Sequence, residues 1–390
     1  MRIPFNKPFL TGKELTYIRD AVESGKISGD GNFTMKCHQF FEEKYKFRKC
    51  LLTTSCTDAL EMCALLLNIE PGDEVIMPSF TFVSTANAFV LRGAKIIFAD
   101  SNSENPNLDT ERIESLITTK TKVIVVVHYA GIACDMDCIM KLAEKYDLKV
   151  VEDAAHGIDS FYKGMPLGGI GHLATFSFHE TKNIQSGEGG MLVINDDSLE
   201  KRAEIIREKG TNRSAFFRGE VDKYGWVDIG SSFLPSEITA AFLYAQLECL
   251  DMIQDKRKLL WQRYWNALSP LCESGRIKLA YIPEYATNNA HMFYIIMQDQ
   301  ETRAALIAYL KENNILSVFH YLSLNESSFY RKKHDGRKLI NSDHYTSRLL
   351  RLPLYFEMDM SQLDHVTDHI IKFYSSHQSG EASVRLNLLS

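Results

Sequence analysis

The sequence predicts an α/β protein in which a large, mostly parallel sheet with helices on both faces is followed by a smaller α+β domain. Three observations support this fold class. In roughly the first two thirds of the 390 residues, short apolar segments alternate with helical segments. After about residue 235, long helical segments replace this alternation. The chain is also too long for a single small core.

In the first part of the chain, short runs of aliphatic and β-branched residues predict strands at 74–77, 95–99, 122–128, 149–152 and 191–194. Segments of helical periodicity lie among them and predict helices at 56–67, 81–91, 109–117 and 136–146. Glycine-containing turns at 71–73 and 92–94 mark helix ends. Strands and helices that alternate in this way are typical of a parallel sheet.

In the second part of the chain, two long helices are predicted at 236–253 and 256–268. They are followed by a strand at 291–297, a helix at 301–313, a strand at 315–319 and a closing helix at 360–373. These elements place a large domain at 1–250 and a small α+β domain at 251–376. The last residues, 377–390, are polar and lack a clear period, so we expect a frayed tail.

The composition limits the kind of protein. Apolar residues make up 45% of the chain and charged residues 24%, as in ordinary soluble globular proteins. The net charge of −6 argues against nucleic acid or an anionic membrane as the main partner. The amino terminus lacks an apolar stretch of signal-peptide length, and the apolar run 123–127 is too short to span a bilayer. We therefore expect a cytoplasmic protein.

The eight cysteines are scattered and include no Cys-x-x-Cys pair. Cys134 and Cys138 are one helical turn apart, but free thiols in a reducing compartment explain the pattern better than a metal site does. We expect no metal. The motifs of serine hydrolases, zinc proteases, P-loop NTPases and dinucleotide-binding folds are absent from the sequence.

Lys182 follows an apolar, strand-like run at 174–179 and precedes the glycine-rich turn 187–190. A lysine desolvated at the end of a sheet has a lowered amine pKa. Near phosphate-binding turns, this is the setting that pyridoxal phosphate requires, because a lysine amine forms a Schiff base with the cofactor's aldehyde. Without this context, Lys182 would be interpreted as a solvated surface lysine.

Asp153 directly follows the predicted strand 149–152, at the edge where open α/β sheets bind ligands. A carboxylate there would keep the pyridine nitrogen of the cofactor protonated. Taken alone, Asp153 would instead be an ordinary cap of the following turn. His156 could hydrogen-bond the cofactor's phenolic oxygen or lie near its ring, and a lone histidine is more often structural. Lys182 favours the functional interpretation of both residues.

Small hydroxyl residues precede the predicted helix 56–67, and the N–H groups at such a helix start bind anions. An ordinary helix cap would look the same. Ser177 could direct its hydroxyl at the same phosphate. Phe82 could stack on a planar cofactor, or it could belong to the core. The loop 24–32 is rich in glycine and predicts either a mobile flap over a site or a surface turn.

Taken together, these segments resemble the sugar-nucleotide aminotransferases of the DegT/StrS type, which belong to fold type I of the pyridoxal-phosphate enzymes. The resemblance covers about residues 3–374 and is carried by the motifs at 152–156, 176–179, 182–183 and 187–190. It implies that Lys182 carries the cofactor, that Asp153 holds the pyridine nitrogen, that His156 neighbours the ring hydroxyl and that Phe82 stacks on the ring. The cofactor phosphate would be held by Ser55, Cys56, Thr57 and Ser177.

The resemblance also implies a homodimer with shared active sites. Ser232 stands where the family often has an asparagine that reaches the phosphate from the neighbouring subunit. The family tends to carry His-Tyr-x-Pro-x-His near the sugar, and here only His320 and Tyr321 of that pattern are present. These two residues, with Ser28 of the glycine-rich loop, would contact the substrate.

The implied reaction moves an amino group from glutamate to dTDP-4-keto-6-deoxy-D-glucose and gives dTDP-4-amino-4,6-dideoxy-D-galactose. Two other products remain open, the 4-amino glucose epimer and a 3-amino sugar. Two other functions remain open as well, a pyridoxal-phosphate sugar dehydratase and a non-catalytic sensor. Relatives that dehydrate their sugar have a histidine in place of the lysine, so Lys182 favours transamination.

Overall fold

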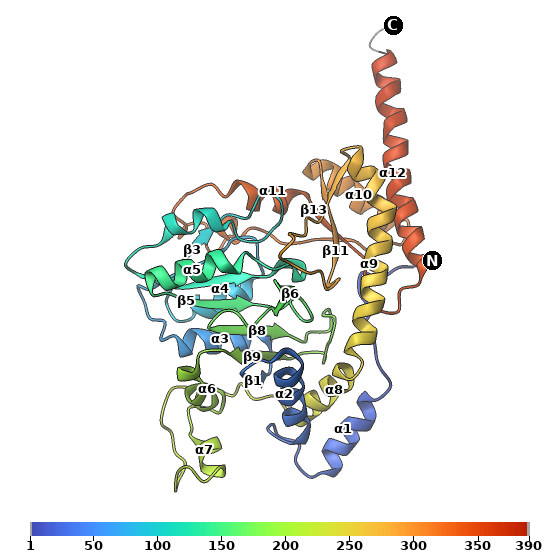
Figure 1. Ribbon diagram of the computed structural model, residues 1–390. Coiled ribbons are helices and arrows are strands. Elements are labelled where there is room, and N and C mark those ends of the chain that lie inside the picture. Colours follow the sequence, from blue (N-terminus) through green and yellow to red (C-terminus); the bar gives the residue numbers. More distant parts are fainter. Residues whose placement is uncertain (1, 388–390) are drawn as a thin grey trace.

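The computed structural model describes residues 2–387, with side chains to residue 375 (Figure 1). A large sheet with helices on both faces forms one part of the molecule, and the small domain packs beside it along the long helix α9 (Leu250–Glu273). The expected fold class, an α/β sheet domain followed by a smaller α+β domain, is confirmed. The domain boundaries stay predictions.

The large sheet has seven strands in the order β1-β9-β8-β5-β4-β2-β3. Neighbouring strands pair in parallel except β9, which is antiparallel to both β8 and β1. The strands are β1 (Lys49–Thr53), β2 (Glu74–Pro78), β3 (Lys95–Ala99), β4 (Thr121–Val127), β5 (Lys149–Asp153), β8 (Leu173–Ser177) and β9 (Gly190–Ile194). A two-stranded hairpin lies apart from this sheet and consists of β6 (Phe161–Tyr162) and β7 (Met165–Pro166).

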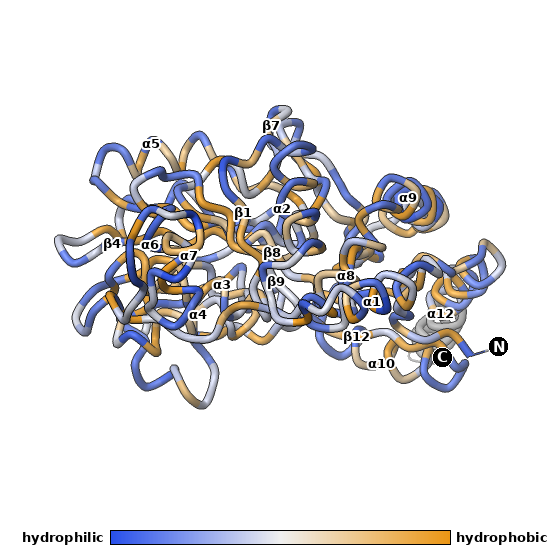
Figure 2. The backbone as a smooth tube through the Cα atoms, turned by 90° about the horizontal axis from the view of Figure 1, so that it is seen from below, coloured by the Kyte–Doolittle hydropathy of each residue, from blue (hydrophilic) through white to orange (hydrophobic). Residues whose placement is uncertain are grey.

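The strands of the large sheet are apolar along their whole length because helices cover both faces. In β4, every residue except Lys122 is buried. One face packs against α3 (Cys56–Leu66), α4 (Val83–Val90) and α6 (Glu200–Arg207). The other face packs against α1 (Glu14–Glu23), α2 (Asn32–Tyr45), α5 (Met136–Tyr146) and α8 (Glu237–Leu247). Figure 2 shows β1 and β8 as hydrophobic segments in the middle of the large domain.

The small domain is built on an antiparallel sheet with the order β10-β11-β13-β12. Its strands are β10 (Ile277–Leu279), β11 (Phe293–Met297), β12 (Val318–Phe319) and β13 (Leu349–Leu352). Its core is closed by helices, which are α9, α10 (Gln300–Glu312) and α12 (Met360–Asn387). A shorter helix, α11 (Ile340–Arg348), lies at the junction with the large domain.

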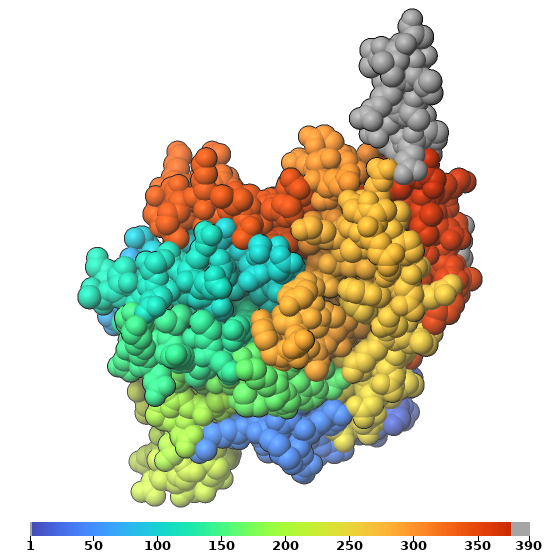
Figure 3. All heavy atoms as spheres, turned by 45° about the horizontal axis from the view of Figure 1, so that its top comes forward, coloured from blue at the N-terminus to red at the C-terminus, as the bar shows by residue number. Residues whose placement is uncertain are grey.

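The segment around α11 lies against the large domain, as the space-filling view in Figure 3 shows. Asp100, just after β3, accepts hydrogen bonds from the N–H groups of Asn341 and Ser342, which are at the start of α11. The hydroxyl of Tyr330 accepts the N–H of Ile96 at 2.6 Å and donates to the carbonyl oxygen of the same residue at 3.4 Å. A carboxylate satisfies the free N–H groups of a helix start, so this contact fixes the small domain against the sheet.

Several predicted boundaries were wrong. The predicted helix 236–253 is two helices, because α8 ends at Leu247 on the sheet and α9 starts at Leu250 in a new direction. The predicted helix 109–117 forms two short 3₁₀ turns, Thr110–Arg112 and Glu114–Leu116, because its residues are largely exposed and only Ile113 is buried.

Other elements differ in length or were missed. The predicted strand 315–319 shrinks to β12, while Ile315 bridges the amino-terminal Ile3. Strand β1 was not predicted, nor was the short helix α7 (Arg213–Phe217). Helix α12 continues to Asn387, past the predicted end at residue 373, and residues 388–390 of the predicted tail lie outside the described residues.

Within residues 2–387, no helix has the length and apolar character needed to cross a membrane. The same described part of the chain contains no group of three or more histidine, cysteine or acidic side chains arranged to hold a metal ion. All eight cysteines are free thiols.

Candidate active site

A cavity of about 590 Å³ opens between the large sheet and the small domain, at the ends of β5 and β8. The residues that the sequence analysis selected line this cavity, except Ser28 and Ser232. Those in the lining are Ser55, Cys56, Thr57, Phe82, Asp153, His156, Ser177, Lys182, His320 and Tyr321. The volume is in the range that holds a cofactor and a small substrate.

Asp153 is the last residue of β5, and only 5% of it is exposed. Thr85 donates its hydroxyl to Oδ2 at 2.7 Å, and the N–H of Ala155 donates to Oδ1 at 3.2 Å. Burial raises the pKa of the Asp153 carboxyl, and these hydrogen bonds oppose the rise. A buried carboxylate with neutral partners is stabilised by a cation placed beside it, and a protonated pyridine nitrogen would be such a cation.

The neighbouring Glu152 has a structural role. Successive strand residues point to opposite faces, so Glu152 points away from Asp153. Its carboxylate is fully buried and accepts the N–H groups of Gly168, Ile170 and Gly171. His128 lies 2.9 Å from the same carboxylate. Glu152 therefore fixes the loop before β8, which lies next to β5 in the sheet.

Lys182 lies in the connection between β8 and β9. This connection is closed by backbone hydrogen bonds from Glu180 to Gly187 and from Ser186 to Phe178. The Lys182 side chain lines the cavity, and burial lowers the pKa of its amine to about 8. Repulsion from Arg351 lowers this pKa further, and attraction to Asp153 opposes the change. A larger fraction of the amine is therefore neutral and nucleophilic near pH 7 than in an exposed lysine.

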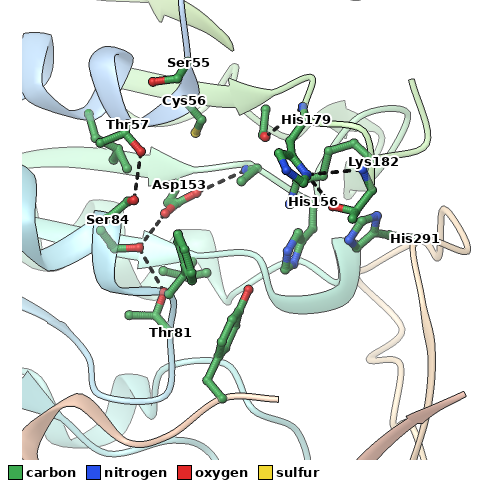
Figure 4. A pocket seen from close by; sticks show the side chains of 18 of the residues that line it. Ser55, Cys56, Thr57, Thr81, Ser84, Asp153, His156, His179, Lys182 and His291 are labelled. Carbon is green, nitrogen blue, oxygen red and sulfur yellow. Dashed lines mark hydrogen bonds between the residues drawn. The ribbon is translucent and has the colours of Figure 1, made fainter. Parts of the chain in front are cut away.

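The start of α3 forms one end of the cavity (Figure 4). Ser55 caps this helix by accepting the N–H of Asp58 at 3.0 Å. Thr57 donates its hydroxyl to Ser84, near the start of α4, at 2.8 Å. Helix starts with free N–H groups and hydroxyl side chains favour an anion such as a phosphate.

The backbone of β9 comes very close to this helix start. A Cβ atom on Gly190 would lie 2.3 Å from the carbonyl carbon of Ser55, so only glycine fits there. Burial raises the pKa of the Cys56 thiol, which keeps it neutral beside this anion site. The residues present therefore fit a phosphate at one end of the cavity and a pyridine ring near Asp153.

Histidine side chains line the other end of the cavity, among them His156 and His291. The rings of His156 and His291 stack at 4.3 Å, and burial lowers the pKa of each histidine well below its usual value. Nδ1 of His156 accepts the N–H of Ala130 at 3.3 Å, so its proton is assigned to Nε2. In Figure 4, His156, Lys182 and His291 lie on the side of Asp153 opposite Ser55, Thr57 and Ser84.

The hydrogen-bond network assigns the proton of His291 as well. The side-chain amide of Asn183 donates to carbonyl oxygens of Gln254 and Asn289, so its own oxygen faces Nδ1 of His291 at 2.9 Å. His291 must therefore donate from Nδ1. This leaves its Nε2 as an acceptor.

His320 and Tyr321 belong to the small domain. Arg351 donates to Nε2 of His320 at 3.4 Å, so the ring donates from Nδ1 to the hydroxyl of Tyr129 at 3.2 Å. The Tyr321 ring lies 6.0 Å from the ring of Phe82, and burial raises the pKa of its hydroxyl. Phe82 is 54% exposed, so one face of its ring is open.

The structure does not bring Ser28 or Ser232 to the cavity. Both residues are exposed. The loop that contains Ser28 is fixed by Glu237, whose buried carboxylate accepts the N–H groups of Gly31 and Phe33. Within one chain, these two serines lie on the surface.

The sequence analysis missed several residues of the cavity. Ser84 and Thr85 lie on a helix that the sequence predicted, but their hydroxyls carried no recognisable signal. His291 and Arg351 come from the small domain, and their positions depend on how the two domains pack. The remaining missed residues are Leu60, Thr81, Val127, Ala155, His179, Thr181 and Glu188.

Comparisons with known proteins find aminotransferases of similar structure. The aminotransferase TlmJ from Streptoalloteichus hindustanus is 26% identical, with a TM-score of 0.89 over 96% of this chain and 100% of that one. Spr1654 from Streptococcus pneumoniae, solved in a PMP form, is 26% identical, with a TM-score of 0.89 over 96% and 99% of the two chains. DesV from S. venezuelae, solved with a ketimine intermediate, is 27% identical, with a TM-score of 0.86 over 95% and 98%.

The model of the DegT/DnrJ/EryC1/StrS aminotransferase family matches residues 8–371. This match covers nearly the whole chain and includes both domains. The expectations of an enzyme, and of pyridoxal phosphate as its cofactor, are thereby confirmed. The chain belongs to the DegT/DnrJ/EryC1/StrS aminotransferase family.

Proposed function

We propose that this aminotransferase moves an amino group from glutamate to dTDP-4-keto-6-deoxy-D-glucose and forms dTDP-4-amino-4,6-dideoxy-D-galactose. One observation carries the proposal. Lys182, with its lowered amine pKa, shares a cavity with the buried carboxylate of Asp153, and the cavity ends at an anion site. Such a cavity has a place for each part of pyridoxal phosphate.

When bound, the cofactor supplies an aldehyde that accepts amino groups and a ring that withdraws electrons from the reacting carbon. The start of α3 and the hydroxyl of Ser177 would hold its phosphate. Asp153 would keep the ring nitrogen protonated, and Nε2–H of His156 would donate to the ring's phenolic oxygen. Lys182 Nζ would remove the proton from the donor's α-carbon and deliver it to the carbon that comes from the cofactor's aldehyde, acting first as base and then as acid.

The sugar substrate is inferred from sequence and from relatives. The segments 79–89, 206–214 and 228–232 resemble the dTDP-4-amino-4,6-dideoxygalactose transaminases that serve synthesis of the enterobacterial common antigen. Spr1654 is named as a sugar aminotransferase. His320 and Tyr321 line the cavity and would contact the sugar.

We also propose that two copies share their active sites. Ser28 and Ser232 are exposed and outside the cavity of their own chain, which is what residues that complete a partner's site require. Exposed apolar side chains lie near Ser232 in the sequence, among them Trp226 at 84% exposure and Val227 at 55%. Exposed apolar side chains of this kind favour association.

The test uses purified protein, glutamate and dTDP-4-keto-6-deoxyglucose. We expect glutamate to bleach the absorbance of the bound cofactor and the keto sugar to restore it, since each half-reaction changes the cofactor's form. The Lys182→Ala variant should bind the cofactor but fail to turn over. NMR of the product should show an axial nitrogen at C4.

Other outcomes would select the alternatives. An equatorial nitrogen at C4 would indicate the glucose epimer, and a nitrogen at C3 would indicate a different regiochemistry. Loss of a sugar hydroxyl without amination would indicate a dehydratase. A protein that shows no cofactor absorbance, or none that glutamate bleaches, would support the sensor and contradict the proposal.

A further inference from the structure

Two buried threonines lie behind the carboxylate of Asp153. Thr85 belongs to the first turn of α4, and Thr81 lies two residues before that helix. Only 2% of Thr81 and 1% of Thr85 is exposed. The Thr85 hydroxyl lies 2.7 Å from Oδ2 of Asp153, and the Thr81 hydroxyl lies 3.0 Å from the Thr85 hydroxyl (Figure 4). The buried carboxylate is therefore the end point of a chain of two hydroxyl groups.

The carboxylate fixes the direction of this hydrogen-bond chain. An ionised carboxylate only accepts hydrogen bonds, so Thr85 donates its single hydroxyl hydrogen to Asp153. Thr85 then has no hydrogen left for Thr81, and the Thr81 hydroxyl is assigned as the donor to Thr85. Hydrogen bonds that are aligned in this way polarise one another, which strengthens the last one. Thr81 thus acts on Asp153 through Thr85.

The chain stabilises the charged form of a carboxyl group that burial destabilises. Burial raises the pKa of Asp153, and the hydrogen bond from Thr85 is the strongest of the effects that lower it. The N–H of Ala155 also lowers this pKa, through its contact with Oδ1. Without the Thr85 hydroxyl, the balance would move toward the protonated carboxyl.

The other titratable groups near Asp153 have smaller effects. Attraction to Lys182 and to His128 lowers the pKa of Asp153 less than the hydrogen bond from Thr85 does. Burial lowers the pKa of His156 and of His291 well below the usual value, so both rings are neutral near neutral pH. Burial also keeps the remaining groups neutral by raising their pKa values; these groups are Cys56, Cys63 and Tyr321.

Asp153 keeps room for the ring nitrogen of the cofactor. Each oxygen of a carboxylate can accept about two hydrogen bonds. Within the described part of the chain, Thr85 is the group that donates to Oδ2, and Asp153 lines the cavity. A hydrogen bond to a carboxylate lowers its affinity for a proton. Thr85 therefore favours the arrangement in which the shared proton stays on the ring nitrogen.

We propose that Thr85, with Thr81 behind it, is a positioning residue that orients the Asp153 carboxylate and keeps the shared proton on the ring nitrogen. This inference rests on the proposed role of Asp153 and extends it to two residues that act through it. Thr85 holds the carboxylate at Oδ2 and Ala155 holds it at Oδ1, so both oxygens are fixed. A ring that keeps its proton withdraws electrons from the reacting carbon more strongly.

The first measurement is made on the holoenzyme loaded with pyridoxal phosphate that carries ¹⁵N in its ring. NMR distinguishes a protonated ring nitrogen from a neutral one. In Thr85→Val, we expect the resonance to move toward the value of a neutral nitrogen. The kcat of this variant should fall about tenfold, as for the loss of a hydrogen bond to a charged group, while the KM values change by less than about threefold.

The second measurement follows the carboxyl group itself in the full-length, cofactor-free chain. Aspartate carboxyl groups labelled with ¹³C are titrated by NMR, and the Asp153→Asn variant identifies the resonance. In Thr85→Val, the midpoint should rise by about one to two pH units, because the charged form loses a hydrogen bond. Thr81→Val should raise it by about half a pH unit or less. Thr85→Ser keeps the hydroxyl and should restore the wild-type midpoint and kcat.

The control is Thr34→Val. Thr34 is fully buried, and its hydroxyl donates to the buried carboxylate of Glu237, which does not line the cavity. This variant loses the same kind of hydrogen bond at another place. It should be destabilised in urea titrations, while the Asp153 midpoint and the ring-nitrogen resonance stay at their wild-type values.

The outcomes separate this proposal from the one on which it rests. An unchanged midpoint or an unchanged ring-nitrogen resonance in Thr85→Val, the same changes in Thr34→Val, or no rescue by Thr85→Ser would overturn the role of Thr85. If Thr85→Val does not fold, Thr81→Val decides, and an unchanged midpoint there would overturn it. A ring-nitrogen resonance that is unchanged in Asp153→Asn would show that Asp153 is not the partner of the ring, and both proposals would fail. A different sugar product would leave the role of Thr85 intact.

Discussion

The lowered pKa of Lys182 leads to a quantitative prediction about its reactivity. The ordinary lysine pKa of 10.5 falls to about 8 in the folded protein, chiefly because of burial. At pH 7 the neutral fraction of the amine is then about 9%, against about 0.03% for an unperturbed lysine. The neutral amine is the nucleophile, so Lys182 should capture the cofactor about 300-fold faster at this pH than an exposed lysine would.

The assay mixes cofactor-free protein with saturating pyridoxal phosphate and follows the absorbance change of covalent capture. Protonation removes the nucleophile, so the rate should rise about tenfold per pH unit below pH 8 and level off above about pH 9. Reduction with borohydride followed by peptide mass analysis should place the cofactor on Lys182. The Lys182→Ala variant is the control, since it can bind the cofactor but has no amine at this position.

A capture rate that keeps rising tenfold per pH unit up to pH 10 would refute the reasoning, because it would show that the Lys182 amine is solvated.

The effect of Arg351 on the pKa of Lys182 offers a second check. Repulsion from Arg351 helps to lower the pKa of Lys182, so Arg351→Gln should move the midpoint of the rate profile to higher pH. A shift to lower pH would contradict the electrostatic account.

Two further predictions concern the cofactor site. The Asp153→Asn variant should retain the cofactor, because the amide oxygen of an asparagine can still accept the hydrogen bond from the Thr85 hydroxyl. Its kcat should fall by about two to three orders of magnitude, because the ring nitrogen loses its buried charge partner. Steady-state kinetics would measure this change, and a fall of less than tenfold would count against the role of Asp153. Gly190→Ala should displace the start of α3, weaken cofactor binding and destabilise the protein by about 1–3 kcal/mol in urea titrations. Gly225→Ala, where a Cβ meets no atom within 4 Å, should leave both properties unchanged, and equal effects of the two changes would contradict the steric argument.

The large sheet was predictable because its strands are buried on both faces and are therefore continuously apolar. The apolar runs that form β2, β3 and β4 are too short for buried helices, so their length favours strands. Strand β1 was harder to recognise because only two of its five residues, Leu51 and Leu52, are aliphatic, and it begins shortly after helix α2 ends at Tyr45. The break between α8 and α9 was missed because both helices bury apolar residues up to their junction, and the change of direction is imposed by the two cores that they join.

Several residues of the cavity were predictable from local sequence for a related reason. Asp153 ends a buried strand, Lys182 follows another, and the hydroxyl residues precede a helix. Each pattern alone has an ordinary structural explanation, and their combination indicated a common site. Parallel strands end at the same edge of a sheet. The geometry of the sheet therefore brings residues that follow different strands close together.

Arg351 shows where local sequence stops being informative. It lies in the short strand β13, between Leu350 and Leu352, where one charged residue would ordinarily be an outward-facing surface position. It reaches the cavity because β13 pairs with β11 and the segment around α11 is fixed to Asp100 of the large domain. The site is thus assembled from two cores, and none of the residues that make this domain contact lines the cavity. The shape of the cavity therefore depends on that contact as much as on the residues that line it.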